Sequence, residues 1–302
     1  MSDPSLDRLE ISSPQVVTFD AILPAAMAAR AEENGVKRAA MAPLTLLILS
    51  ILGGAFIAFG AIFATTVSAG TAELSYGVAR LLSALVFPVG LILIVVAGAE
   101  LFTGNNLIVM AWANGKVKTR DVLINWAITF AGNFIGALTM AVMMYFTAQY
   151  TFGGGSVGLS ALVTAHAKSS LTFGPAVILG LMCNSLVCLA VWMAYSARTT
   201  VDRVVTIIPP IAAFVAAGFE HCIANIYFIP IGLFIKAGAP DSFWASIKKT
   251  PADFPNLTWG NFLLANLIPV TIGNIIGGAV MVAAVYWFVY LRLKHTNFTR
   301  DK

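Results

Sequence analysis

A single histidine lies deep inside an apolar stretch of the sequence, directly after a glutamate. His221 follows Glu220 within residues 204–235, and Glu220 is the only residue of that stretch with a full charge. An ionisable group at the centre of a bilayer costs about 2.5–3.5 kcal/mol on insertion scales, so its presence needs a reason. Because an imidazole changes charge between about pH 5 and 8, we expect His221 to donate and accept protons. A hydrogen-bonded packing residue is the alternative interpretation.

Glu100 has the corresponding place in an earlier apolar stretch. Both glutamates end an Ala-Gly-x-Glu segment, and an asparagine follows five residues later, Asn105 or Asn225. Asn133 and Asn274 lie in matched Gly-Asn-x-Ile-Gly segments further along the chain. We predict that the two glutamates satisfy irregular backbone or orient the histidine rather than contact a solute. Amides satisfy such backbone well, so the four asparagines are expected in the same polar cluster.

The stretches that hold these residues are long enough to cross a membrane. The chain is 59% hydrophobic and 11% charged, whereas soluble domains carry roughly 25% charged residues. Six stretches are nearly free of charge: about 40–69, 81–112, 122–150, 171–197, 204–235 and 261–291. Each exceeds the roughly 20 residues that a membrane helix needs. The sequence therefore predicts an all-α membrane protein with six transmembrane helices. No basic run or motif indicates a nucleic-acid partner.

The second and fifth stretches are expected to be broken helices. Each is longer than one straight span needs, holds a glutamate near its middle and is punctuated by glycines and prolines. Irregular backbone survives at membrane depth only where it lines a cavity or is buried in protein. Both breaks are therefore candidates for a polar site near the midplane.

The matched segments occur in the same order in both halves, so spans one to three and four to six look like copies of one unit. A unit with three spans must enter the membrane in opposite orientations in its two copies, as in many transporters. With the N-terminus inside, most of the 18 lysines and arginines fall on the inner side. This bias predicts that both termini are cytoplasmic.

Other classes of site find little support in the sequence. The three cysteines lie in apolar stretches without metal-ligand spacing, and we predict neither a metal site nor a cofactor. One embedded histidine does not make the pair that a haem b subunit usually needs, and no HExxH segment is present. The sequence also lacks the apolar N-terminal region of a signal peptide. We therefore do not expect an enzyme.

The chain resembles the formate/nitrite transporter family, and most closely its bacterial formate channels. The segments that carry the resemblance are Leu-Pro-Ala-Ala-Met at 23–27, Ala-Glu-Leu-Phe-Thr at 99–103, Val-Cys-Leu-Ala-Val-Trp at 187–192, Gly-Phe-Glu-His-Cys-Ile-Ala-Asn at 218–225 and Ile-Pro-Val-Thr-Ile-Gly-Asn at 268–274. They span almost the whole chain in the family's order. The resemblance implies an aquaporin-like protomer with its own pore, assembled as a homopentamer in the inner membrane.

The resemblance also implies roles for particular residues. His221 and Thr103 match the residues that face the pore centre, Lys168 matches a lysine that raises the outer potential, and Asn184 matches an asparagine near the histidine. The residues that match apolar constrictions are Phe87, Leu91 and Phe214. The residues that match a supporting polar network are Glu220, Asn225 and Asn274.

The implied organisation has three parts. They are a cytoplasmic segment at 1–38 with an amphipathic run at about 21–33, a transmembrane channel domain at 39–292 with repeats at about 39–150 and 171–292, and a cytoplasmic tail at 293–302. Gly104-Asn105-Asn106 departs from the small hydroxyl residues of close formate channels, so the substrate stays open between formate, nitrite and hydrosulfide. A bare carboxylate meets a large desolvation cost between aromatic rings. We therefore expect His221 to allow passage of the neutral acid, with protons as partners.

Overall fold

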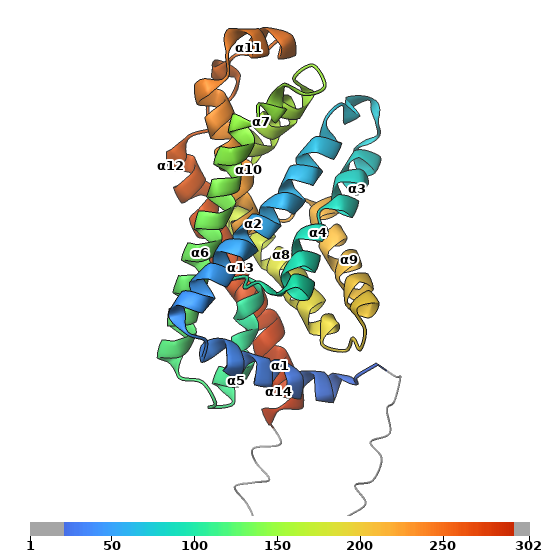
Figure 1. The fold of residues 1–302 in the computed structure, drawn as a ribbon, viewed down its shortest axis with the longest axis vertical. Coiled ribbons are helices and arrows are strands. Elements are labelled where there is room, and N and C mark those ends of the chain that lie inside the picture. The colour runs from blue at the N-terminus through green and yellow to red at the C-terminus, as the bar shows by residue number, and fades with distance from the viewer. Residues whose placement is uncertain (1–20, 293–302) are drawn as a thin grey trace, which may run out of the picture.

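The structure is a computed structural model that describes residues 21–292 and is all-helical in that range (Figure 1). The predicted tail at 293–302 and the first 20 residues of the predicted N-terminal segment lie outside this range. Six described helices are long and apolar enough to cross a membrane. They are α2 (Pro43–Ser68), the α3 to π-helical run Tyr76–Gly98, α6 (Thr119–Phe146), α8 (Phe173–Ala194), α9 (Thr200–Ala217) and the run Trp259–Tyr290. The predicted all-α fold with six spans is confirmed.

Shorter helices lie between and beside the spans. The run Tyr76–Gly98 consists of α3 (Tyr76–Val86), α4 (Val89–Ile92) and a π-helical turn, and the last span consists of α12 (Trp259–Asn261), α13 (Ile268–Ile275) and α14 (Val285–Tyr290) with π-helical segments between them. The remaining helices are α1 (Pro24–Ala39), α5 (Val109–Ala113), α7 (Ser156–Ser169), α10 (Cys222–Gly238) and α11 (Asp241–Ile247). Helices α10 and α11 meet at a bend of 114°. α1 and α7 lie at opposite ends of the molecule (Figure 1).

Both predicted breaks are present, and a glycine ends the helix at each. The second span ends at Gly98, with a φ of 86°, and the fifth ends at Gly218, with a φ of 77°. Glycine adopts this left-handed conformation without the penalty of a Cβ atom, so it is the usual residue beyond a helix C-terminus. The chain resumes after Thr103 as a 3-10 turn and after His221 as α10. Both functional candidates therefore stand where a half-helix begins.

The two halves repeat the same contacts around their breaks. The Asn133 side chain donates to the carbonyls of Ser50 and Glu100 and accepts from the Phe102 N–H. The Asn274 side chain makes the same three bonds, to Gly180, Glu220 and Cys222. These amides fasten each break to the neighbouring spans, as a repeated three-helix unit predicts.

The matched contacts extend beyond the predicted repeat boundaries to α1 and α7. The Asn125 amide donates to the carbonyl of Arg38 at the end of α1, over 3.0 Å. The Asn266 amide donates to the carbonyl of Lys168 near the end of α7, also over 3.0 Å. Each half therefore comprises one short helix and three spans, and the equivalent short helices lie at opposite ends of the molecule (Figure 1). A pair of units in opposite orientations predicts this placement.

Glycines let the spans approach closely enough for these contacts. A Cβ atom on Gly136 of α6 would meet the backbone of Ile51 in α2, and one on Gly277 would meet the backbone of Leu181 in α8. Small residues at helix contacts permit such backbone approach in membrane proteins. The matched glycines thus set the packing of α2 on α6 and of α8 on the last span.

Candidate functional site

The centre of the molecule is a contact between the two breaks. Thr103 Oγ1 lies 3.0 Å from His221 Nε2, and both side chains are buried. His221 is also the N-cap of α10, where its Nδ1 accepts a hydrogen bond from the Ala224 N–H over 3.1 Å. A ring nitrogen that accepts carries no proton, so the neutral ring has its proton on Nε2. His221 therefore presents an N–H donor toward Thr103.

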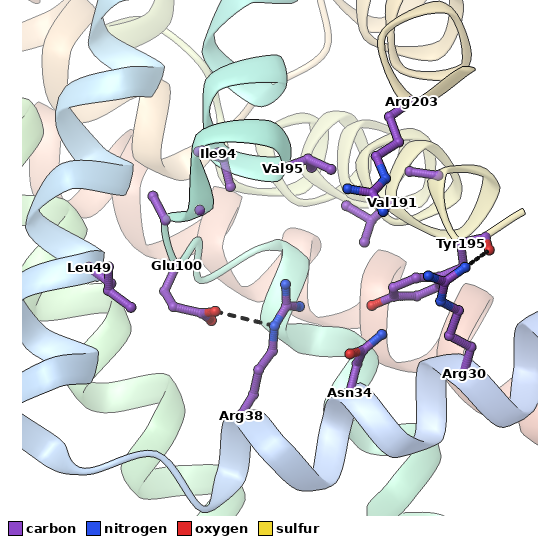
Figure 2. Close-up of a pocket in the computed structure, with 13 residues that line it drawn as sticks. Arg30, Asn34, Arg38, Leu49, Ile94, Val95, Glu100, Val191, Tyr195 and Arg203 are labelled. Carbon is purple, nitrogen blue, oxygen red and sulfur yellow. Dashed lines mark hydrogen bonds and ion pairs between the residues drawn. The ribbon is translucent and has the colours of Figure 1, made fainter. Parts of the chain in front are cut away.

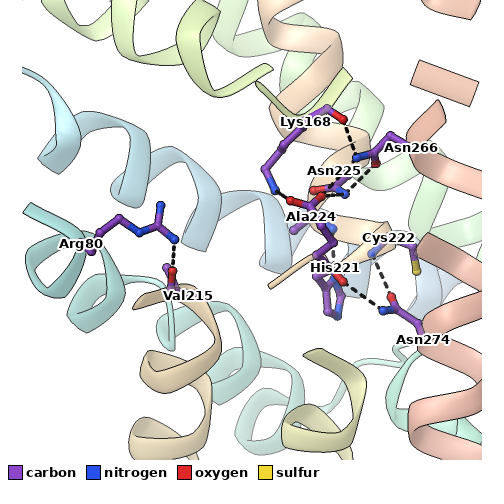
Figure 3. A network of polar contacts seen from close by, with 10 residues as sticks. Arg80, Lys168, Val215, His221, Cys222, Ala224, Asn225, Asn266 and Asn274 are labelled. Carbon is purple, nitrogen blue, oxygen red and sulfur yellow. Dashed lines mark hydrogen bonds and ion pairs between the residues drawn. The ribbon is translucent and has the colours of Figure 1, made fainter. Parts of the chain in front are cut away.

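A cation and two amides hold Glu220. Figure 3 shows these three side chains, Lys168, Asn225 and Asn266, close to His221. Lys168 Nζ lies 2.9 Å from Glu220 Oε1. Asn225 Nδ2 donates to Glu220 Oε2 over 2.7 Å, and Asn266 Nδ2 donates to the same oxygen over 3.2 Å. The Lys168 charge is therefore shared with a carboxylate rather than facing the solute alone.

Glu100 belongs to a different network at the other break. Its Oε1 lies 3.3 Å from Nε of Arg38 (Figure 2). The Asn105 side chain donates a hydrogen bond to the Asn125 side chain over 3.0 Å rather than to Glu100. The structure thus distributes the polar residues of the predicted cluster over two networks, one at each break, and His221 lies beside the network of Glu220.

Asn184 connects the two breaks behind Thr103. Its Nδ2 donates to the Asn274 carbonyl over 2.7 Å, to Asn106 Oδ1 over 2.8 Å and to the Thr103 carbonyl over 3.3 Å. The side chain is completely buried. Asn184 therefore fixes the backbone that carries Thr103, and no direct bond from Asn184 to His221 is present among the contacts of residues 21–292.

The described residues line two cavities, one toward α7 that His221 lines and one toward α1, and a small apolar space adjoins the first. The cavity toward α7 has a volume of about 440 Å³ and is lined by Lys168, Glu220, His221, Phe87 and Phe214, among others. The cavity toward α1 has a volume of about 360 Å³. The small space shares Phe87, Phe214 and His221 with the cavity toward α7. Its volume is about 10 Å³, and its other lining residues are Ile57, Leu91, Leu101, Val187 and Ile211. A single water needs roughly 10–15 Å³ of such volume, so the small space is nearly closed.

Aromatic rings form part of the wall of this small apolar space. The rings of Phe87 and Phe214 meet edge to face at 5.5 Å, and the Phe214 ring lies nearly parallel to the His221 ring at 6.1 Å. Phe87 joins α3 to α4, and Phe214 belongs to the last turn of α9. The structure therefore brings together Phe87, Phe214, Leu91 of α4 and the central histidine, as the sequence leads us to expect.

Comparison with known proteins decides the family. The model described as formate/nitrite transporter matches residues 25–288. The chain belongs to the formate/nitrite transporter family. "Formate channel FocA" of Escherichia coli (strain K12) is 45% identical over 274 residues, covering 91% of this chain and 96% of the relative. The FocA of Haemophilus influenzae is 37% identical over 271 residues, covering 90% and 95% of the two chains.

Solved structures of the family have the same fold. A "Pentameric formate channel with formate bound" superposes with a TM-score of 0.79 at 44% identity, covering 83% of this chain and 98% of that one. An "FNT family ion channel" superposes with a TM-score of 0.71 at 26% identity, covering 87% and 98%. The chain is thus a membrane protein, and its relatives are channels and transporters, which confirms the resemblance and the prediction that it is not an enzyme.

Three polar residues of the two networks, Asn125, Asn266 and Arg38, were not predicted as site residues from the sequence. Asn125 precedes Asn133 by eight residues, and Asn266 precedes Asn274 by the same step. Each pairs with the asparagine that follows its glutamate, Asn105 in one half and Asn225 in the other. The shared spacing is a signal that could have identified both residues. Arg38 carries no such signal, because its contact with Glu100 spans two elements far apart in the sequence.

Proposed function

We propose that this chain conducts formate, or a similar small monocarboxylate, and that the acid crosses the small apolar space beside His221 in its neutral form. The observation that carries the proposal is the Thr103–His221 contact, with His221 lining a narrow apolar space beside the cavity toward α7. The names of the relatives supply the anion, since they are formate channels. His221, Thr103 and the flanking aromatic rings supply the chemistry.

Desolvation decides the form in which the anion crosses. A carboxylate loses its water between Phe87 and Phe214, and aromatic rings return little of the cost, which reaches tens of kcal/mol in a low-dielectric limit. Protonation removes most of this cost. A proton donor at the edge of the rings is therefore more effective than a wider pore, and His221 lies at that edge.

Charges in the cavity toward α7 favour entry of an anion. Lys168 and Arg80 line this cavity together with one carboxylate, Glu220. Arg80 donates to the carbonyls of Val215 and Ala216 at the end of α9. These carbonyls do not cancel the full charge of the guanidinium, so the cavity keeps a positive balance that raises the local concentration of anions.

Proton transfer requires the imidazolium form of His221. The neutral ring can donate an Nε2–H hydrogen bond to the anion but cannot readily give up that proton. A second proton on Nδ1 displaces the Ala224 N–H bond. The imidazolium then gives its Nε2 proton to formate, leaving neutral imidazole and formic acid, and a proton from either side restores the cation. We propose that the cap is lost when the cation forms and is recovered only when Nδ1 releases its proton.

Uptake into vesicles tests the proposed function. Proteoliposomes containing the full chain are expected to take up labelled formate faster than protein-free vesicles at the same pH. Unlabelled nitrite and hydrosulfide serve as competitors, and formate is expected to compete best. Uptake equal to that of protein-free vesicles would remove the proposal, and stronger competition by nitrite or hydrosulfide would reassign the substrate.

We further propose that the chain forms a homopentamer in the inner membrane with both termini cytoplasmic. The solved relative at 44% identity is described as pentameric. Large apolar side chains are exposed along the spans of the single chain, including Leu44, Phe63, Phe146, Ile178 and Val285. Such surfaces require lipid or another subunit. Native mass spectrometry of the solubilised protein is expected to give five copies, and a monomer or trimer would contradict this assembly.

A further inference from the structure

Arg80 connects two spans beside the wall of the small apolar space. It belongs to α3, and its Nε donates to the Ala216 carbonyl over 3.2 Å. Its Nη2 donates to the Val215 carbonyl (Figure 3). The last carbonyls of a helix have no partner within that helix, and they carry a negative partial charge that a cation stabilises. The Arg80 guanidinium therefore stabilises the C-terminus of α9 from a neighbouring span.

The carbonyls that Arg80 binds belong to the residues directly after Phe214. Phe87 follows Arg80 by seven residues in the second span, and residues seven apart lie on the same face of a helix. The rings of Phe87 and Phe214 meet edge to face at 5.5 Å. Arg80 and Phe87 therefore hold the last turn of α9 together, one through its backbone and the other through a ring.

α9 is the least buried of the six described spans in the single chain. Its buried residues are Ile207, Ile211 and Phe214. Of these, Ile211 and Phe214 line the small apolar space themselves. A shift of α9 would therefore change the width of this space directly, and the two Arg80 bonds oppose such a shift.

The break after α9 leaves room for the guanidinium. Gly218 ends the helix with a φ of 77°, and a Cβ atom at this position would lie only 3.3 Å from Arg80 Nη2. The glycine thus permits both the left-handed backbone and the close approach of the arginine. Arg80 is therefore packed against the same break that carries His221 three residues later.

We propose that Arg80 is a positioning residue that keeps the small apolar space narrow by holding Phe214 against Phe87. The space has a volume of about 10 Å³, close to that of one water. Its consequence for transport rests on the proposed function. A wider space admits water beside the anion, so it weakens the preference for the neutral acid, and it also admits larger acids than formate.

Charge and geometry predict different results for a lysine at this position. Arg80→Lys keeps the positive charge of the cavity toward α7 but replaces the planar fork of N–H donors by a single ammonium. A role in attracting anions needs only the charge, whereas a fixed geometry at two carbonyls needs the fork. Arg80→Lys is therefore expected to widen the space as Arg80→Gln does. Only Arg80→Gln is expected to raise the KM for formate, because only this variant loses the charge.

Osmotic water permeability of proteoliposomes measures the width of the space without formate. Wild-type vesicles are expected to exceed protein-free vesicles only slightly, because the space hardly holds one water. Both Arg80 variants are expected to raise this excess at least about tenfold, the factor that loss of a charge-assisted hydrogen bond typically gives. Uptake of propionate relative to formate is expected to rise in the same variants, with protein-free vesicles subtracted.

Lys236→Gln is the matched control for the loss of a cation that binds two carbonyls. Lys236 lies in the last turn of α10 and donates to the carbonyls of Phe254 and Leu257. Its side chain lies outside the lining of the cavity toward α7. Lys236→Gln is expected to keep the water permeability of the wild type. Melting temperatures in detergent show which variants are folded.

A wild-type water permeability in Arg80→Lys would overturn the proposal and leave Arg80 a role through charge alone. An equal rise in Lys236→Gln would overturn it as well, because the effect would then be a general loosening of the fold. Arg80→Lys keeps one donor and decides the result where Arg80→Gln does not fold. A raised water permeability in Arg80→Lys, without formate uptake by the wild type, would support the positioning role and remove the proposed function instead.

Discussion

His221, the proposed proton-handling residue, is constrained at both ring nitrogens. His221 Nδ1 accepts from the Ala224 N–H, and Nε2 faces the Thr103 hydroxyl. These contacts fix the orientation of the ring and the tautomer of its neutral form. The helix N-terminus adds a positive partial charge beside Nδ1, which opposes protonation of that nitrogen. These contacts therefore favour the neutral ring, and in the proposed mechanism an anion nearby stabilises the cation.

The ion pair beside the histidine gives a prediction at the scale of single residues. Lys168→Gln removes the cation from Glu220, whose side chain is 6% exposed. Removing one partner of a buried pair typically destabilises a protein by about 3–5 kcal/mol, and the 15% exposure of Lys168 favours the lower end. The melting temperature in detergent is expected to fall. It should recover in part when Glu220→Gln is added, because the unpaired charge is then removed.

Lys118→Gln is the control for this prediction. Lys118 is exposed, and its substitution removes the same charge. A Lys168→Gln variant with the melting temperature of the wild type would contradict the stabilising role of the ion pair. So would a double variant that is less stable than both single variants.

The residue types of the site could be predicted, whereas their partners could not. His221 and Glu220 are conspicuous because charge is rare in an apolar stretch, and Thr103 follows from the resemblance. The pairing of Glu220 with Lys168 joins positions 52 residues apart, and that of Thr103 with His221 joins positions 118 apart. Contacts over such separations depend on how the elements pack, which the local pattern does not encode.

At the scale of elements, the presence of the two breaks could be predicted from the sequence, but their exact positions could not. Glycines and prolines marked both stretches, and Gly98 and Gly218 prove to be the residues that end the helices. The prolines do not form the polar breaks, although Pro88 lies in the turn between α3 and α4, ahead of the break at Gly98. Pro209 and Pro210 lie inside α9, and Pro230 lies inside α10. The polar break is therefore set by a residue that tolerates positive φ rather than by loss of a backbone donor.

Close packing of the spans gives a prediction at this scale. Gly136→Ala is favoured by helix propensity by about 1 kcal/mol, yet its Cβ would meet the backbone of Ile51, which cannot move without shifting α2. Overpacking of this kind costs about 1–3 kcal/mol or more. The variant is expected to melt at lower temperature in detergent than the wild type.

The matched control is Gly174→Ala in the first turn of α8, where no atom lies within 4 Å of an added Cβ. The control is expected to keep or slightly raise the melting temperature. Equal melting temperatures for Gly136→Ala and Gly174→Ala would show that the α2–α6 contact has room for a larger residue.

At the scale of the whole molecule, the matched contacts of the two halves agree with the predicted repeat. Each half contributes one broken span, one anchoring asparagine and one cation paired with a glutamate. The two breaks meet at Thr103 and His221, and His221 lines the cavity toward α7. Sequence matches indicated the repeat, but the inclusion of α1 and α7 emerged only from tertiary contacts, because neither helix is a membrane span.

Formate flux as a function of pH, in the wild type and in His221→Asn, tests the central claim most directly. Asparagine can still cap α10 through its side-chain oxygen, but it cannot take up a proton. Wild-type flux is expected to rise as the pH falls, because the imidazolium is restored more often at a higher proton concentration, with protein-free vesicles subtracted at each pH and His166→Asn as the matched control. His221→Asn is expected to lose at least about tenfold in flux and to lose the pH dependence, since 1.4 kcal/mol of lost stabilisation already gives tenfold. A His221→Asn variant with the rate and pH profile of the wild type would contradict passage of the neutral acid.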